Sequence, residues 1–352
     1  MDSLSPTFLT ILVYQQSRML ARRLTQACHA RPTHRKLTER TSFLGLHTLS
    51  YEQYGDKSAS KTAVFIHGML GSKKNMRTPC REFIKANPDY TCLTIDLRGH
   101  GLSHNLGGQP TIQECASDLT KLFQSLNIAS PQMMVAHSLA GKVALQYLQF
   151  CMQQDVPLPH NTWILDSLPG PYGNIGKDVN NSQSVANVVK ALDKLSMPLP
   201  TRTDVVNSIT ELGIALPIAQ WLSTSLQQTP CGGVTWVFDL PVAKQLFANF
   251  MELDLRSFLE GYEGEGVIHF VRAGRSDKWT PEVLTFFEDI IQQQQWQAAG
   301  AGVGVRVGSG EEAYYRNLQL HIMPAAGHWL HSEDLQGLLT IMNAHNVHKE
   351  EK

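Results

Sequence analysis

The segment 131–150, P-Q-M-M-V-A-H-S-L-A-G-K-V-A-L-Q-Y-L-Q-F, constrains the fold more than any other part of this chain. Residues 133–136 form a short apolar run that suits a buried parallel strand, and the apolar residues after the serine recur with a helical period. Ser138 lies at the junction, with Ala136 two residues before it and Ala140 two residues after it. A strand that turns directly into a helix crowds its backbone, so these neighbours must be small. The pattern is therefore typical of a nucleophile elbow, G-x-S-x-G, with alanine in place of both glycines.

Ser138 also has a simpler interpretation. Serine is a favoured N-cap residue, and an ordinary turn from a strand into a helix would place it at the same position. The motif alone favours neither interpretation, so the rest of the chain has to decide between them.

Short apolar runs alternate with helical periodicity on both sides of Ser138. The expected strands are 47–54, 62–66, 91–95, 133–136, 162–165, 267–271 and 318–323, and the expected helices between them are 75–85, 112–126, 139–150, 280–294 and 333–344. This alternation predicts the α/β class, with a mostly parallel sheet and helices on both faces. The core would comprise residues 41–170 and 263–352.

The alternation stops between residues 171 and 262. Here helices are expected over 185–195, 205–216, 218–226 and 239–259, punctuated by prolines. We expect this stretch to form a helical lid inserted between strands of the sheet. The alternative is a helical subdomain that only adds stability.

Two further segments fall outside the α/β pattern. Residues 1–40 contain seven Arg or Lys and two acidic residues, with an amphipathic helical pattern, which is typical of an organelle transit peptide. A disordered basic tail would have the same composition. Residues 296–310, W-Q-A-A-G-A-G-V-G-V-R-V-G-S-G, are expected to form a flexible Gly/Ala insertion.

Charge and composition exclude several classes of protein. A formal net charge of −1 leaves no overall basic surface for nucleic acid. No apolar run in the amino-terminal segment approaches the roughly 18 residues that a transmembrane helix needs. The six cysteines are spread singly, with no C-x-x-C pair that would suggest zinc. We therefore expect a small-molecule substrate, no cofactor, no metal and no nucleic acid; protein partners are not predicted.

A serine hydroxyl becomes a strong nucleophile only when a base accepts its proton, an acid orients that base, and donors stabilise the oxyanion. His328, in P-A-A-G-H-W-L-H just after the last expected strand, is the predicted base, and His331 is the competing candidate. The amides of Met69, after strand 62–66, and of Leu139, at a helix amino terminus, are the predicted oxyanion hole.

Two residues are candidates for the acid. Asp277 lies in the loop after strand 267–271, where most enzymes of this kind carry the acid, and is the preferred candidate. Asp166 ends strand 162–165, which also places its carboxylate at the carboxyl edge of a parallel sheet.

Five short segments together resemble the α/β-hydrolase superfamily, over about residues 41–170 and 263–348: H-G-M-L-G-S, D-L-R-G-H-G-L-S, A-H-S-L-A-G-K, A-G-R-S-D and A-G-H-W-L-H. The details of 67–75 and of the last segment are similar to the abhydrolase domain-containing protein 11 group and to small bacterial esterases. The resemblance implies a Ser/Asp/His esterase with a helical lid, located in mitochondria in animals. It also implies an acid either at Asp166 or within the lid, where Asp239 would match.

The sequence thus predicts a serine hydrolase that cleaves carboxylic esters, including lipid or acyl esters, through an acyl-enzyme intermediate. The expected location is mitochondrial, with plastid or cytoplasm as the alternatives. A serine nucleophile argues against the dehalogenases and epoxide hydrolases of this fold, which use a carboxylate. The alternative function is a receptor or ligand-binding protein that keeps the fold and turns over slowly or not at all.

Overall fold

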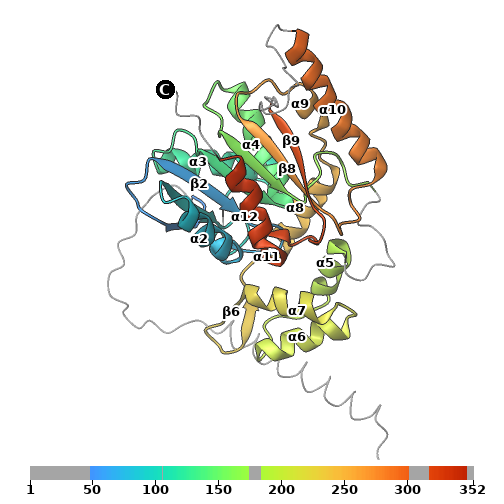
Figure 1. Cartoon of the computed structure of the whole chain (residues 1–352). Coiled ribbons are helices and arrows are strands. Elements are labelled where there is room, and N and C mark those ends of the chain that lie inside the picture. The colour runs from blue at the N-terminus through green and yellow to red at the C-terminus, as the bar shows by residue number, and fades with distance from the viewer. Residues whose placement is uncertain (1–47, 105, 174–183, 301–316, 347–352) are drawn as a thin grey trace, which may run out of the picture. The chain divides into compact units, whose positions relative to one another are not determined.

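The computed structural model describes residues 48–104, 106–173, 184–300 and 317–346, and of residues 294–300 only the backbone (Figure 1). The described residues form two compact units. The core unit comprises residues 48–173 and 241–346, and the inserted unit comprises residues 184–240. Among the described helices, none combines the length and the apolar character that crossing a membrane requires.

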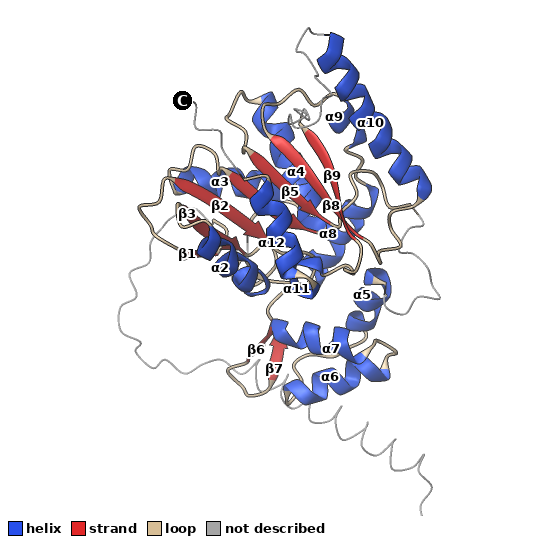
Figure 2. Ribbon diagram, viewed as in Figure 1, coloured by secondary structure: helices blue, strands red, loops and turns tan. Residues whose placement is uncertain are grey.

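A seven-stranded sheet forms the centre of the core unit (Figure 2). Its strands are Tyr51–Tyr54 (β1), Lys61–Ile66 (β2), Tyr90–Ile95 (β3), Met133–His137 (β4), Asn161–Leu165 (β5), Val267–Ala273 (β8) and Leu318–Met323 (β9). The spatial order is β1-β3-β2-β4-β5-β8-β9. β1 pairs antiparallel with β3, and the other five pairings are parallel. The prediction of a mostly parallel sheet is confirmed, and the carboxyl ends of the parallel strands meet at one edge.

Helices cover both faces of this sheet. On one face lie α2 (Arg77–Ala86) and α12 (Leu335–Ala344), and on the other lie α3 (Ile112–Ser125) and α4 (Leu139–Gln153) (Figure 2). The central strands β3, β4 and β5 are buried at every position because helices cover both faces, as in other parallel sheets.

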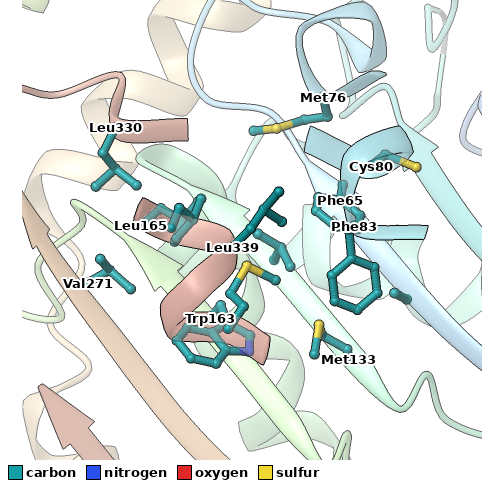
Figure 3. Packing of buried hydrophobic residues seen from close by; sticks show 14 of the residues in the cluster. Phe65, Met76, Cys80, Phe83, Met133, Trp163, Leu165, Val271, Leu330 and Leu339 are labelled. Carbon is teal, nitrogen blue, oxygen red and sulfur yellow. The ribbon is translucent and has the colours of Figure 1, made fainter. Parts of the chain in front are cut away.

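The hydrophobic core between α2, α12 and the sheet is built from large side chains (Figure 3). Phe83 of α2 packs edge-to-face on Phe65 of β2 and on Tyr90 of β3, with ring centroids 5.8 and 5.3 Å apart. Trp163 of β5 and Leu339 of α12 continue the same cluster. Packing of this kind fixes the strands and, with them, the loops at their carboxyl ends.

The boundary of the inserted unit differs from the expected range 171–262. Except for its first residue, helix α8 (Leu240–Glu252) belongs to the core unit, and so does α9 (Arg256–Glu260). The reason is a long-range contact: the Lys142 amine of α4 donates to the carbonyl oxygens of Phe250 and Leu253, at 2.7 and 2.6 Å. The lid function itself stays a prediction.

The inserted unit is not entirely helical. It contains α5 (Val185–Asp193), α6 (Arg202–Glu211), α7 (Leu216–Leu222), the 3-10 turn Ser223–Ser225 (η2), and an antiparallel pair of strands, β6 (Leu226–Gln228) and β7 (Val234–Trp236). The expected helix over 205–216 is interrupted at Gly213, which has a φ of +87°. The strands have three residues each, too few to show a period in the sequence.

Two expectations lie wholly or partly outside the described residues. The predicted transit peptide falls within residues 1–47 and remains a prediction. Of the expected insertion 296–310, the first five residues continue helix α10 (Pro281–Gly300), because alanine and glutamine favour that conformation. Residues 301–310 are not described.

Candidate active site

Ser138 occupies the turn between β4 and α4 in a conformation that few residues adopt. Its φ and ψ are +55° and −119°, which costs a residue other than glycine about 1–3 kcal/mol. An N-cap serine has an extended backbone and accepts a hydrogen bond through its side chain, and Ser138 does neither. The geometry is that of a nucleophile elbow and not that of an ordinary cap.

Close packing around the turn explains which neighbours must be small. A Cβ on Gly141 would lie 2.6 Å from the Cβ of Ser167, and one on Gly68 would lie 3.1 Å from the Cβ of Ser138. Ala136 and Ala140 are fully buried and fit without this crowding. The requirement for glycine thus falls on Gly141 and Gly68, so the two alanines leave the elbow intact.

His328 is hydrogen-bonded to Asp166. The His328 Nδ1 lies 2.7 Å from the Asp166 Oδ2, and the Asp166 carboxylate is fully buried at the carboxyl end of β5. Four further groups donate to the carboxylate: Trp279 Nε1 at 2.8 Å, Ser276 Oγ at 3.0 Å, the Ala273 amide at 3.3 Å and Lys278 Nζ at 3.4 Å. This carboxylate is therefore well placed to orient the imidazole.

Asp277, the acid that the sequence favours, is not the carboxylate that bonds His328. Its side chain is exposed, and the hydrogen bond of His328 goes to Asp166, the alternative candidate. Asp239 is an exposed residue of the inserted unit. The physical reason lies in the sheet order, since β5 is the immediate neighbour of β4 and brings Asp166 next to the elbow.

The protonation states of the pair follow from its surroundings. Burial would raise the pKa of Asp166, but the hydrogen bond from His328 and the charge of Lys278 outweigh burial and hold that pKa well below its usual range. Burial and then the charge of Lys278 lower the pKa of His328, while Asp166 opposes the shift. A neutral imidazole beside an ionised carboxylate is the arrangement that a general base requires.

His137, the residue before Ser138, anchors the loop that carries His328. Its Nε2 donates to the backbone carbonyl of His328 at 2.8 Å, and its ring lies 4.7 Å from the ring of His328. His331, the competing base candidate, also packs on His137, with ring centroids 4.4 Å apart, and is buried. The sequence analysis missed His137, because the motif places no requirement on that position.

The residues of the predicted oxyanion hole lie in two neighbouring turns. Leu139 is the first residue of α4, where amides have no acceptor within the helix. Met69 follows β2 in a buried turn, and within the described residues its amide donates to no acceptor. Two histidines brace this turn: His67 bonds the Gly68 carbonyl at 2.7 Å, and His100 accepts from the amide after Met69 at 3.1 Å.

Metal ligands do not gather at this site. Across residues 48–346, apart from the segments that the structure leaves undescribed, no group of three or more His, Cys, Asp or Glu side chains is placed to hold a metal ion.

Comparison with known families assigns the fold. Residues 63–339 match the model of the alpha/beta hydrolase family, which covers well over half of the chain. The chain therefore belongs to the alpha/beta hydrolase family, and the resemblance noted in the sequence is confirmed.

Individual relatives agree with this assignment. The chain is similar to the sn-1-specific diacylglycerol lipase ABHD11 of Mus musculus, with 24% identity over 83% of this chain and 82% of that protein. The protein of the same name from Danio rerio is 35% identical, over only 28% of this chain and 30% of its own length. Among solved structures, a marine microorganism esterase superposes with a TM-score of 0.63 at 18% identity, covering 84% of this chain and 98% of its own. That likeness concerns the fold.

Proposed function

We propose that this chain is a serine hydrolase of carboxylic esters in which Ser138 is the nucleophile, His328 the base and Asp166 the acid. The observation that carries the proposal is the 2.7 Å bond between His328 and the buried Asp166, at the edge of the sheet where Ser138 forms a strained elbow. Membership of the alpha/beta hydrolase family supports a hydrolytic reaction.

In the proposed reaction, the Ser138 Oγ attacks the ester carbonyl while its proton passes to the His328 Nε2. The amides of Met69 and Leu139 donate to the oxygen that becomes negative. The tetrahedral intermediate collapses, and His328 returns the proton to the departing alcohol, which leaves an acyl-enzyme. A water molecule then gives its proton to His328 and attacks the acyl carbon, which releases the acid and restores Ser138.

Acylglycerols are the proposed substrate class. The support is that two similar proteins are sn-1-specific diacylglycerol lipases. A receptor that keeps the same fold is the alternative, and it would bind an ester without turnover. The proposed mitochondrial location has its support only in the composition of residues 1–40.

A fluorophosphonate probe tests the nucleophile without knowledge of the substrate. We expect the full chain to be labelled at Ser138 and the variant Ser138→Ala to lose both the label and the hydrolysis of short-chain ester and diacylglycerol substrates. Ser125→Ala, a serine at the end of α3, is the matched control and should keep both. Labelling that persists in Ser138→Ala contradicts the assignment. Labelling of Ser138 without hydrolysis of any ester favours the receptor.

A further inference from the structure

Lys278 places a cation directly beside the acid and the base. Its Nζ lies 2.8 Å from the His328 Nδ1, 3.5 Å from the His328 Nε2 and 3.4 Å from the Asp166 Oδ2. The side chain is largely buried, with 17% of its surface exposed. The sequence analysis assigned no role to this residue, and the reaction proposed above does not use it.

The charge that His328 gains on protonation makes this contact significant. In the neutral tautomer that the proposed reaction uses, Nδ1 donates its hydrogen to Asp166 and Nε2 is free to accept a proton. Protonation at Nε2 gives the ring a positive charge, and the ring then faces the Lys278 ammonium at 2.8 Å from Nδ1. Two positive charges at that distance repel each other.

Three carboxylates and one histidine act on this contact. Asp166 at the end of β5 faces both cations and favours their charged forms. Asp277, on the loop of Lys278, acts on Lys278 in the same direction, and Glu333 of α11 (Leu330–Glu333) acts likewise on His328. The neighbouring histidine on β4, His137, is buried and neutral, because burial holds its pKa well below the usual value.

We propose that Lys278 is a positioning residue of this site, which opposes protonation of His328 and so extends the activity to lower pH. The proposal depends on His328 acting as the base, as proposed above. A base acts only while it is neutral, so any group that disfavours its protonated form moves the acid limb of the pH profile downward. Removal of the Lys278 ammonium should move the acid limb to higher pH.

The test is the rate of fluorophosphonate labelling of Ser138 in the full chain, measured from pH 4.5 to 9. We expect Lys278→Met, which keeps the length of the side chain and removes its charge, to move the acid limb up by about one pH unit. Its plateau at high pH should at least equal that of the wild type, since the imidazolium formed during attack no longer meets a second cation. Lys278→Arg, which keeps the charge, should retain the acid limb of the wild type.

Lys57→Met is the matched control, because it removes one exposed positive charge from the loop between β1 and β2. Its profile should be that of the wild type. An unchanged acid limb in Lys278→Met, with a lower plateau, overturns the proposal and makes Lys278 a packing residue only. An equal shift in Lys278→Met and Lys57→Met overturns it too, because the effect is then one of net charge. Absence of labelling at Ser138 in the wild type contradicts the proposed function instead, so the two failures are distinguishable.

Discussion

The core unit contains two clusters of histidines whose surroundings differ. The edge histidines, His137, His328 and His331, lie at the carboxyl edge of the sheet beside Ser138. The sheet histidines are His269 of β8, His321 of β9 and His345, which follows α12. His269 stacks on Trp163 with ring centroids 3.9 Å apart and planes 6° apart, and His345 lies 4.8 Å from His321.

Burial lowers the pKa of histidines in both clusters, but the hydrogen-bond partners of the two clusters are different. His328 bonds a buried carboxylate. Within the part of the chain that the structure describes, the sheet histidines bond neutral groups: His269 faces His321 at 3.1 Å and the Asn161 amide oxygen at 2.9 Å, and His345 bonds the Ile341 carbonyl. An imidazole that must accept a proton during a reaction needs a neighbour that stabilises the imidazolium. The comparison therefore supports the proposed base at the edge and is consistent with a structural role for the sheet histidines.

The largest expected effect is on kcat, and it should distinguish the edge histidines from the sheet histidines. We expect His328→Ala to lower kcat for an ester substrate by about 10⁶-fold, because the loss of a triad base removes nearly all of the catalysis that the triad supplies. His321→Ala should keep kcat within a few-fold, and circular dichroism checks that both variants fold. A collapse in His331→Ala with activity retained in His328→Ala would transfer the role of base to His331.

The second largest expected effect on kcat concerns Asp166, the carboxylate that bonds an edge histidine. We expect Asp166→Asn to lower kcat by about 10⁴-fold, since the amide no longer holds the imidazole in the reactive tautomer. Asp277→Asn, the matched change in the exposed loop, should lower kcat only slightly. Both variants keep the shape of the side chain, so steady-state kinetics report the charge. The reverse result would restore Asp277, the preferred candidate from the sequence.

Patterns in the sequence were enough to identify Ser138 and His328 as candidates. Ser138 directly follows β4 and His328 lies five residues after the end of β9, and a strand end is visible as a change of period in the sequence. The choice between Asp166 and Asp277 required the order of the strands in space, because both residues follow a strand. His137 stands at a position of the motif that can be any residue.

Other features depend on contacts between distant parts of the chain. The Lys142 amine bonds the carbonyl of Phe250, in α8, and that of Leu253, just after it, and these bonds join α8 to the core unit. No periodicity in either segment predicts them. The role proposed for Lys278 depends on Asp166 and His328, 112 and 50 residues away, which meet at its amine.

The smallest expected effect is on the pH dependence of the unfolding free energy, with kcat unaffected. Burial and the neighbouring histidines lower the pKa of His269 to about 2, whereas an unfolded histidine has a pKa of about 6.5. The folded state therefore favours neutral His269. The contribution of His269 to folding stability is lost progressively as the pH falls below about 6.5. From pH 6.5 to 5 this one residue should cost about 2 kcal/mol of unfolding free energy. We expect His269→Phe, which can still stack on Trp163, to show a correspondingly weaker loss between pH 7 and 5 in urea unfolding followed by circular dichroism, with kcat unchanged at pH 8. The same loss in variant and wild type would mean that His269 does not oppose acid unfolding, and the contrast between the clusters would then rest on catalysis alone.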